Sequence, residues 1–295
     1  MNAPIPEHGP AVIRHDPLTD PIALVCDSPH SGIFYPDDFE CAVDKELLRQ
    51  GEDNHVHELW KAAPAVGATL VEATFPRVYI DPNRSLKDLD PNLLSEPWPE
   101  PLSPGEKTRL GKGLIWTTLD EGVRIYDRKL PAAEIRKRID QFYAPYHEVL
   151  SQAIADRYEQ FGALWHLNLH SMPNNAYERM GMSTDRKLAD FVLGDRDGTT
   201  CDPEFVGLVE SFLIRKGYSV ARNDPYKGVE LIAQIGQPHL NRHSLQIEII
   251  RPIYMNEQTR EQNEGFATLQ ANLTELLGVL REYIISEQAR AQRAV

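Results

Sequence analysis

The sequence has little of what marks secreted, membrane-spanning or disulfide-rich proteins. Its only three cysteines, Cys26, Cys41 and Cys201, lie far apart without CxxC spacing, which argues against a disulfide framework or a structural zinc knuckle. The first twenty residues lack a basic region and an apolar region, so no secretory signal is visible. No apolar run approaches the roughly 18–20 residues that span a bilayer. We therefore expect a cytoplasmic protein without a membrane partner.

Positive charge is also scarce. The 31 Lys and Arg against 44 Asp and Glu give a formal net charge of -13, and the basic residues form no run. Because a nucleic-acid ligand usually demands a basic face, we expect no nucleic-acid partner. What is present is an ordinary globular composition, 41% hydrophobic and 25% charged, which can bury a sizeable core. The oligomeric state stays open.

Strand and helix patterns alternate along the chain. Residues 1–20, punctuated by prolines, predict an extended N-terminal arm, and residues 21–295 predict a single domain. Strand patterns occupy 22–26, 68–80, 163–172, 190–195, 219–236 and 244–255, and helical patterns occupy 44–67, 132–162, 201–217 and 251–284. The alternation favours an α/β sheet with helices on both faces. Residues 87–112 hold five prolines and predict a long surface excursion.

Histidines and carboxylates gather near the predicted strand ends. The stretch "LVCDSPHSGIFYP" (24–36) places His30 in a loop directly after a strand, where ligands bind in open α/β sheets. In "WHLNLHSMP", strand alternation puts His166, Asn168 and His170 on one face. The stretch "GEDNHVHEL" offers four further polar groups, namely Glu52, Asp53, His55 and His57. These residues are candidate metal ligands.

Glu248 stands in the otherwise apolar strand "LQIEII". A carboxylate in a buried strand costs several kcal/mol unless it is paired, hydrogen-bonded or close to a cation. Two histidines and a carboxylate at the ends of elements would make a zinc-type site of three protein ligands with a fourth position open to water. A free carboxylate beside it would be the natural general base.

Asn83 and Arg84, in "DPNRS", end another predicted strand. A guanidinium beside an amide is suited to binding a carboxylate through two hydrogen bonds, although Arg84 could instead pair with Asp81 or Asp88 at the surface. Further arginines without a rank among them are Arg77, Arg124, Arg128, Arg242 and Arg251. A serine nucleophile is a poor alternative, since neither Ser31 nor Ser171 lies in a GxSxG motif.

Ten short blocks, in order from about residue 24 to residue 255, resemble the N-formylglutamate amidohydrolase family. They are "DSPHSGIFYP", "EDNHVHEL", "ATFPRVYIDPNRS", "KGLIW", "IYDRKLPAAEI", "PYHEVL", "NLHSMP", "LGDRDGT", "NDPYKG" and "SLQIEIIRPIYM". The resemblance implies a three-layer α/β/α fold with a central mixed β-sheet, carboxypeptidase-like within the phosphorylase/hydrolase-like group. It also implies a hydrolase of linear amides that uses Zn²⁺, or another divalent metal such as Co²⁺, to cleave N-formyl-L-glutamate to formate and L-glutamate in histidine degradation.

The resemblance also implies roles for single residues. The metal ligands would be His30, Asp53 and His170, with Glu52 as the alternative to Asp53. Glu248 would be the general base and acid. The groups that bind substrate carboxylates would be Asn83, Arg84, Arg242 and Arg77. In two places the sequence departs from the pattern: residue 33 is Ile where carboxypeptidases carry a glutamate ligand, and Asn168 replaces an acidic residue that is frequent in the family.

Two other functions compatible with the sequence stay open. The substrate could be another small anionic N-acyl or N-formimino amino acid, such as an aspartate derivative, because a pocket distinguishes one methylene by only about 1–3 kcal/mol. A non-catalytic protein that binds acylated amino acids is the second. Retention of His30, His170 and Glu248 favours an enzyme, because a binding protein has no use for a free base beside a metal.

Overall fold

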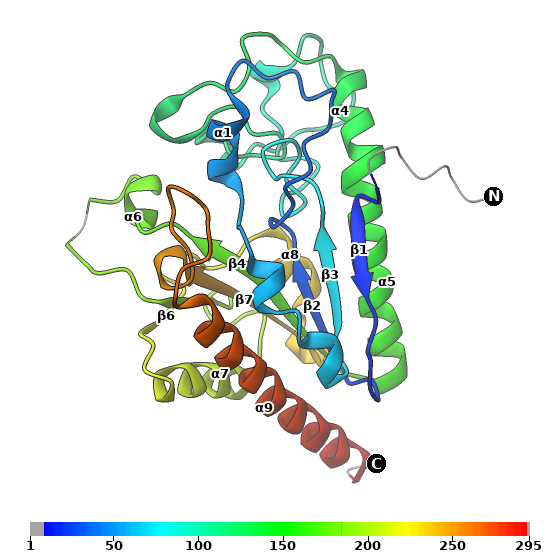
Figure 1. Ribbon diagram of the computed structural model, residues 1–295. Coiled ribbons are helices and arrows are strands. Elements are labelled where there is room, and N and C mark those ends of the chain that lie inside the picture. Colours follow the sequence, from blue (N-terminus) through cyan, green and yellow to red (C-terminus); the bar gives the residue numbers. More distant parts are fainter. Residues whose placement is uncertain (1–8, 184, 294–295) are drawn as a thin grey trace. The chain divides into compact units, whose positions relative to one another are not determined.

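Seven strands form one mixed sheet in the computed structural model, which describes residues 9–183 and 185–293 (Figure 1). Their order across the sheet is β1-β3-β2-β4-β7-β5-β6. Strands β2, β4 and β7 run parallel, β5 is antiparallel to β7, and β6 is parallel to β5. The strands are β1 Val12–His15, β2 Leu24–Ser28, β3 Thr69–Ala73, β4 Leu164–Met172, β5 Phe191–Gly194, β6 Val220–Arg222 and β7 Arg242–Ile250. The predicted α/β class with a central mixed sheet is confirmed.

The helices range from single turns to the long C-terminal helix. The α-helices are α1 Lys45–Leu48, α2 Val56–Leu59, α3 Glu106–Arg109, α4 Ala132–Arg138, α5 Ala144–Phe161, α6 Ala176–Arg179, α7 Pro203–Arg215, α8 Glu230–Ile235 and α9 Phe266–Arg293. Short 3₁₀ turns are η1 Arg49–Gly51, η2 Ala63–Val66, η3 Pro91–Leu93, η4 Asp120–Gly122, η6 Pro238–Leu240 and η7 Arg251–Ile253, and η5 Ile139–Tyr143 is a π-turn.

Helix α7 follows its sequence signals, and three other predictions need correction. The predicted strand over 68–80 is wrong beyond Ala73, where β3 ends. The Asp202 side chain caps α7 by accepting the N–H of Glu204, and Gly217 ends the following turn with φ +91°. The predicted strand over 219–236 is wrong beyond Arg222, because its apolar side chains are buried as one face of α8. The C-terminal helix begins at Phe266, since the segment from residue 251 starts as the proline-containing turn η7.

The chain divides into two compact units. The first contains the described residues up to 13, Pro29–Asp53 and Glu72–Leu150, and the second contains Arg14–Ser28, Asn54–Val71 and the chain from Ser151 onward. A single domain over residues 21–295 therefore stays a prediction. Of the predicted N-terminal arm, residues 1–8 lie outside the described residues, and the remainder contributes strand β1.

The central strands of the second unit have one apolar and one polar face. Alternate residues of β2, β4 and β7 join a cluster with α7 and α9, for example Leu24, Leu167 and Ile247 (Figure 1). Helix α8 packs on β4 and β7 outside that cluster. The intervening residues of these strands include seven buried polar side chains, namely Asp27, His166, Asn168, His170, Ser244, Gln246 and Glu248, beside the apolar Val25, Leu164 and Met172. Because buried polar groups must be hydrogen-bonded, this second face is organised by its side-chain contacts.

In the first unit a buried arginine anchors the segment that leads to Asp81. The Arg138 side chain is fully buried and donates to the carbonyl of Tyr79 at 2.9 Å and to the hydroxyl of Tyr126 at 2.7 Å. It also pairs with Glu134. Two residues after Tyr79, the backbone N–H of Asp81 donates to the carbonyl of Leu114 at 2.8 Å. These bonds hold the Asp81 segment at both ends.

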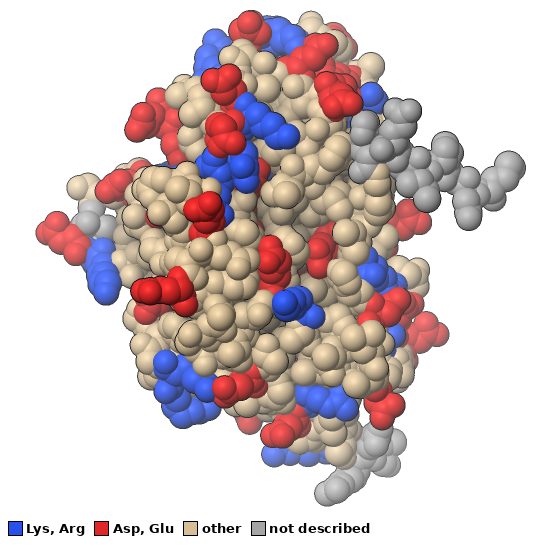
Figure 2. All heavy atoms as spheres, viewed as in Figure 1, with Lys and Arg blue, Asp and Glu red and all other residues tan. Residues whose placement is uncertain are grey.

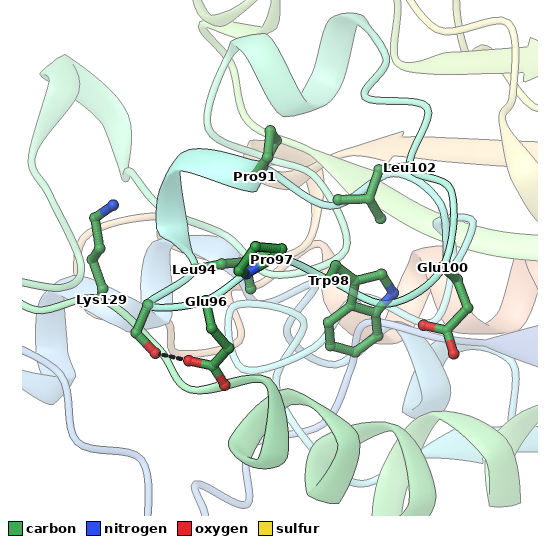
Figure 3. Close-up of a pocket in the computed structure, with 9 residues that line it drawn as sticks. Pro91, Leu94, Glu96, Pro97, Trp98, Glu100, Leu102 and Lys129 are labelled. Atoms are coloured by element: carbon green, nitrogen blue, oxygen red, sulfur yellow. Dashed lines mark hydrogen bonds between the residues drawn. The ribbon is translucent and has the colours of Figure 1, made fainter.

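The predicted excursion over 87–112 contains only η3 and α3 as regular elements. Its first half lines most of an open pocket of about 550 Å³, in which Trp98 lies among two prolines, two leucines, a serine, two glutamates and Lys129 (Figure 3). Acidic and basic side chains are intermixed over the face drawn in Figure 2. Within the described residues no helix is long and apolar enough to cross a membrane.

We predict that Gly32→Ala destabilises the protein by about 1–3 kcal/mol, because an added Cβ would lie 2.3 Å from the backbone oxygen of Phe75, which cannot move without its segment. Gly207→Ala is the matched control. It lies inside α7, where the nearest atom would be 3.8 Å away, so it should be neutral or stabilising by up to about 1 kcal/mol. Urea unfolding of the two variants checks this, and equal stability would contradict it.

Candidate functional site

His30 lies two residues beyond the end of β2 and is buried in the first unit. Its Nε2 is 2.8 Å from Asp81 Oδ1, and its Nδ1 is 3.5 Å from Asp53 Oδ2. The backbone N–H of Asp53 donates to the His30 carbonyl at 2.9 Å, and the Ser31 hydroxyl donates to the Asp53 carbonyl at 3.1 Å. These bonds fasten two loops of the first unit together, with the Asp53 carboxylate facing Nδ1 of the imidazole.

The charge of Asp81 fixes the tautomer of His30. Burial alone would raise the pKa of Asp81, but the charges of Arg77 and Arg84 and the hydrogen bond from His30 lower it well below its ordinary value. Arg77 donates to Asp81 Oδ2 from Nη2 at 3.0 Å and from Nε at 3.2 Å. An ionised carboxylate only accepts hydrogen bonds, so His30 Nε2 carries the proton. The lone pair of His30 is therefore on Nδ1, the atom that faces Asp53.

Between the two neighbouring carboxylates, Asp53 has the better position for a metal ligand. Glu52 accepts the Tyr35 hydroxyl at 2.8 Å, and its two oxygens lie 3.2 and 3.1 Å from Arg49 Nε. This places the Glu52 carboxylate against a cation and a phenol, whereas the Asp53 carboxylate faces the lone pair of an imidazole. The position of Asp53 supports the sequence-based preference for it.

Arg84 is buried in a group of cations in the first unit. Its Nε donates to the Lys112 carbonyl at 3.0 Å, its Nη1 donates to the Asn83 carbonyl at 2.8 Å, and its Nη2 is 3.8 Å from Asp81 Oδ2. Arg77 and Lys112 belong to this group, and each lies over the Trp116 ring, 5.1 and 5.3 Å from its centroid. Arg84 is thus not a surface arginine, and its surroundings suit an anionic ligand.

Lys107 belongs to the same group and was not singled out from the sequence. Burial and the charge of Arg84, together with Arg77 and Lys112, lower the pKa of Lys107 to about 8, although Glu106 opposes the shift. A cluster of positive charges that lowers the pKa of one of its own members attracts an anion. The spacing of cations in "EKTRLGK" was the available signal, but only the fold brings Arg77 and Arg84 to it.

His170 and Glu248 are neighbours in the second unit. They occupy paired positions of β4 and β7, on the polar face of the sheet. His170 Nε2 is 2.7 Å from Asn168 Oδ1, and Glu248 Oε1 accepts a hydrogen bond from Gln246 Nε2 at 3.0 Å. Asn168 in turn donates to Asp27 at 2.8 Å. With its Nε2–H given to an amide oxygen, His170 has its lone pair on Nδ1, as His30 does.

Three sequence candidates lie elsewhere in the second unit. His55 Nδ1 is 2.9 Å from Glu58 Oε1 and its Nε2 is 2.8 Å from the carbonyl of Arg260, and His57 lies in the short helix α2, which begins directly after His55. Arg242 opens β7 beside the ring of Tyr158. Six residues at about 3.3 Å each separate it from Glu248 by roughly 20 Å along the strand. This placement argues against Arg242 as a substrate ligand.

Arg251, unranked in the sequence, directly follows β7 and is buried. Its Nε donates to the Ser171 hydroxyl at 3.3 Å. Arg251 is therefore the arginine of the second unit that stands at the same strand ends as His170 and Glu248.

Comparisons with known proteins agree on one family. The model of the family described as N-formylglutamate amidohydrolase matches residues 22–255. An N-formylglutamate deformylase of Pseudomonas putida is 30% identical over 240 residues, 80% of this chain and 83% of the relative, and one of Pseudomonas aeruginosa is 28% identical over 245 residues, 80% and 84%. The crystal structure of N-formylglutamate amidohydrolase from Ralstonia eutropha is 62% identical with a TM-score of 0.92 and covers 94% of this chain and 99% of its own.

We predict that Lys107 loses its proton near pH 8, so that about nine-tenths of the molecules carry its charge at pH 7 and about one-tenth at pH 9. A ¹³C NMR titration of Cε-labelled lysine measures this, with Lys107→Arg identifying the signal. Arg84→Met removes the neighbouring charge that lowers the pKa of Lys107 most, so this pKa should rise in the variant. A Lys107 titration near the value of free lysine would contradict the expectation.

Proposed function

Because this chain belongs to the N-formylglutamate amidohydrolase family, we propose that it hydrolyses the formyl amide of N-formyl-L-glutamate to formate and L-glutamate. The observation that carries the proposal is the arrangement of its two buried imidazoles. Each gives its Nε2–H to a side chain of its own unit, Asp81 or Asn168, and keeps its Nδ1 lone pair. Two such imidazoles and the carboxylate of Asp53 are the donor set of a hydrolytic zinc site.

Chain connectivity supports the combination of His30, Asp53 and His170 as ligands. In the parallel pair β2–β4, Asp27 lies opposite Asn168. His30 follows Asp27 by three residues and His170 follows Asn168 by two, so His30 comes just after the carboxyl end of β2 and His170 lies near the carboxyl end of the adjacent β4. Asp53 is bound to the backbone of His30. We propose that these three side chains hold Zn²⁺ or another divalent metal such as Co²⁺.

Glu248 is the proposed proton carrier. A divalent metal in this site would supply Lewis acidity, which lowers the pKa of water towards about 7 and polarises the formyl carbonyl. The Glu248 carboxylate, on the strand position paired with His170, accepts a proton from the attacking water. It then returns that proton to the amide nitrogen as the C–N bond breaks. The remaining hydroxyl proton of the former water also passes to the nitrogen, so the products are formate and the ammonium group of glutamate, and Glu248 ends as the carboxylate it was.

The cation group of the first unit binds the substrate in this account. Arg84, with the Asn83 side chain, binds the α-carboxylate, and the guanidinium fork suits a planar carboxylate. Arg77 is held by Asp81 and adds positive potential for the side-chain carboxylate. A chain with a formal net charge of -13 needs such a local cation group to bind a dianion.

We predict that removing divalent metal with a chelator abolishes formate release from N-formyl-L-glutamate and that adding Zn²⁺ or Co²⁺ restores it. N-formyl-L-aspartate, assayed in parallel, should be the poorer substrate, by about ten-fold or more for one methylene. Restored activity on the aspartate compound alone would keep the mechanism and contradict the substrate. Activity unaffected by the chelator would contradict the metal.

We predict that Glu248→Gln lowers kcat by about 10²–10⁴-fold while the protein retains its metal, because the amide keeps the shape of the side chain and cannot take a proton. Arg242→Met, at the far end of the same strand, is the control and should leave kcat and KM unchanged. Formate release and metal content are measured for both variants. Near-wild-type turnover by Glu248→Gln would rule out this residue as the base.

A further inference from the structure

A buried chain of hydrogen bonds crosses β2, β4 and β7 in the second unit. Ser244 Oγ lies 2.8 Å from His166 Nδ1, and His166 Nε2 lies 2.8 Å from Asp27 Oδ1. The same Asp27 oxygen accepts from Asn168 Nδ2 at 2.8 Å, and Asn168 Oδ1 lies 2.7 Å from His170 Nε2. None of the five side chains is more than 3% exposed. This hydrogen-bond network thus links the proposed metal ligand His170 to groups deep in the sheet.

The first three members have the order of a Ser–His–Asp triad, yet they do not suit nucleophilic catalysis. Ser244 is fully buried on β7, and its backbone N–H and carbonyl are both hydrogen-bonded to Thr200. A substrate carbonyl would have to enter the sheet to reach its hydroxyl. The network must therefore act on the group at its other end, His170.

Asp27 decides the direction of every bond in this chain. Asn168 Nδ2 donates to Asp27 Oδ1, and the same carboxyl oxygen lies within hydrogen-bond distance of His166 Nε2, so this oxygen is the acceptor of both bonds. The Asn168 amide is thereby turned with its oxygen towards His170. That oxygen accepts a hydrogen bond, so the His170 proton resides on Nε2 and its lone pair on Nδ1.

We propose that Asp27 is a positioning residue that fixes the tautomer of His170 through Asn168 and thereby strengthens metal binding. The inference rests on the proposed function in that His170 is taken as a metal ligand. Without the negative charge at Asp27, the Asn168 amide is free to turn over. Its NH₂ then donates to His170 Nε2, which places the imidazole proton on Nδ1, the nitrogen that the metal needs.

The two imidazoles reach the same state by different routes. His30 donates directly to the carboxylate of Asp81, whereas an amide separates His170 from the carboxylate of Asp27. The Asn168 amide links the Asp27 carboxylate to His170, because its NH₂ donates to Asp27 and its oxygen accepts from His170. Asn168 therefore accepts the Nε2–H of His170 in place of the acidic residue expected two positions before it.

The test compares Asp27→Asn with the wild-type chain at full length. Nitrogen-15 spectra of the histidine side chains, recorded on chelator-treated protein, give the His170 tautomer, and competition with a chromogenic chelator gives the zinc affinity. The wild type should show His170 protonated at Nε2. Asp27→Asn should show the Nδ1–H form as well and bind zinc about 10–100-fold more weakly, the usual effect of losing a group behind a ligand.

Two further variants separate orientation from a general loss of packing. Ser244→Ala cuts the same buried network at the end away from His170, so it should lower the melting temperature and leave zinc affinity unchanged. The double variant Asp27→Asn/Asn168→Asp moves the carboxylate next to His170, where it accepts the Nε2–H directly. Zinc affinity should then return to within about three-fold of the wild type.

Specific results would overturn the proposal. His170 protonated at Nδ1 in the wild type would do so even if Asp27→Asn failed to fold. Wild-type zinc affinity in Asp27→Asn, or an equal loss in Ser244→Ala, would exclude the relay while leaving the metal site intact. A wild type that binds no zinc would refute the proposed metal site, and the tautomer spectra would still decide whether Asp27 orients His170.

Discussion

The cost of burying polar groups governs this structure. One face of β2, β4 and β7 carries aliphatic side chains and packs on helices, as the core of any α/β protein does. The other face carries carboxylates, amides and imidazoles that are just as buried and must satisfy one another. Each partner leaves few choices to the next: Asp27 accepts, so Asn168 turns, and His170 takes a single tautomer. The same constraint acts in the first unit, where Arg77 and Arg84 keep Asp81 ionised and Asp81 orients His30.

The chemistry follows from these constraints. Two imidazoles with the lone pair on Nδ1, a carboxylate at Asp53 and a second carboxylate at Glu248 are the parts of a metal-assisted amide hydrolysis. The cation group around Arg84 supplies what a dicarboxylate substrate requires, and the mutual repulsion of its members, visible in the lowered pKa of Lys107, is relieved when an anion binds. Membership of the N-formylglutamate amidohydrolase family agrees with both requirements.

Local patterns predicted much of this, and long-range pairing accounts for the rest. Strand alternation placed His166, Asn168 and His170 on one face, and the strand-end rule found His30. The same rule failed for Asn83 and Arg84, because β3 ends at Ala73, ten residues before Asn83. Asp27 and Asp81 were not assigned their roles, because these depend on which strands and loops become neighbours, and a single sequence does not show that. Arg242 could not be placed relative to Glu248 from the sequence, because its pattern gives no sign of which end of β7 it occupies. Helix α8 was missed because its buried residues fit a strand as well as a helix over so short a segment.

The most direct test of the central claim is a crystal structure of the zinc-loaded protein with the metal located by its anomalous scattering. The account predicts one zinc ion bonded to Nδ1 of His30, Nδ1 of His170 and the carboxylate of Asp53. It also predicts that Nε2 of the two imidazoles stays hydrogen-bonded to Asp81 and Asn168. Ligation through Nε2 of either histidine, or an ion bound away from these three residues, would contradict it.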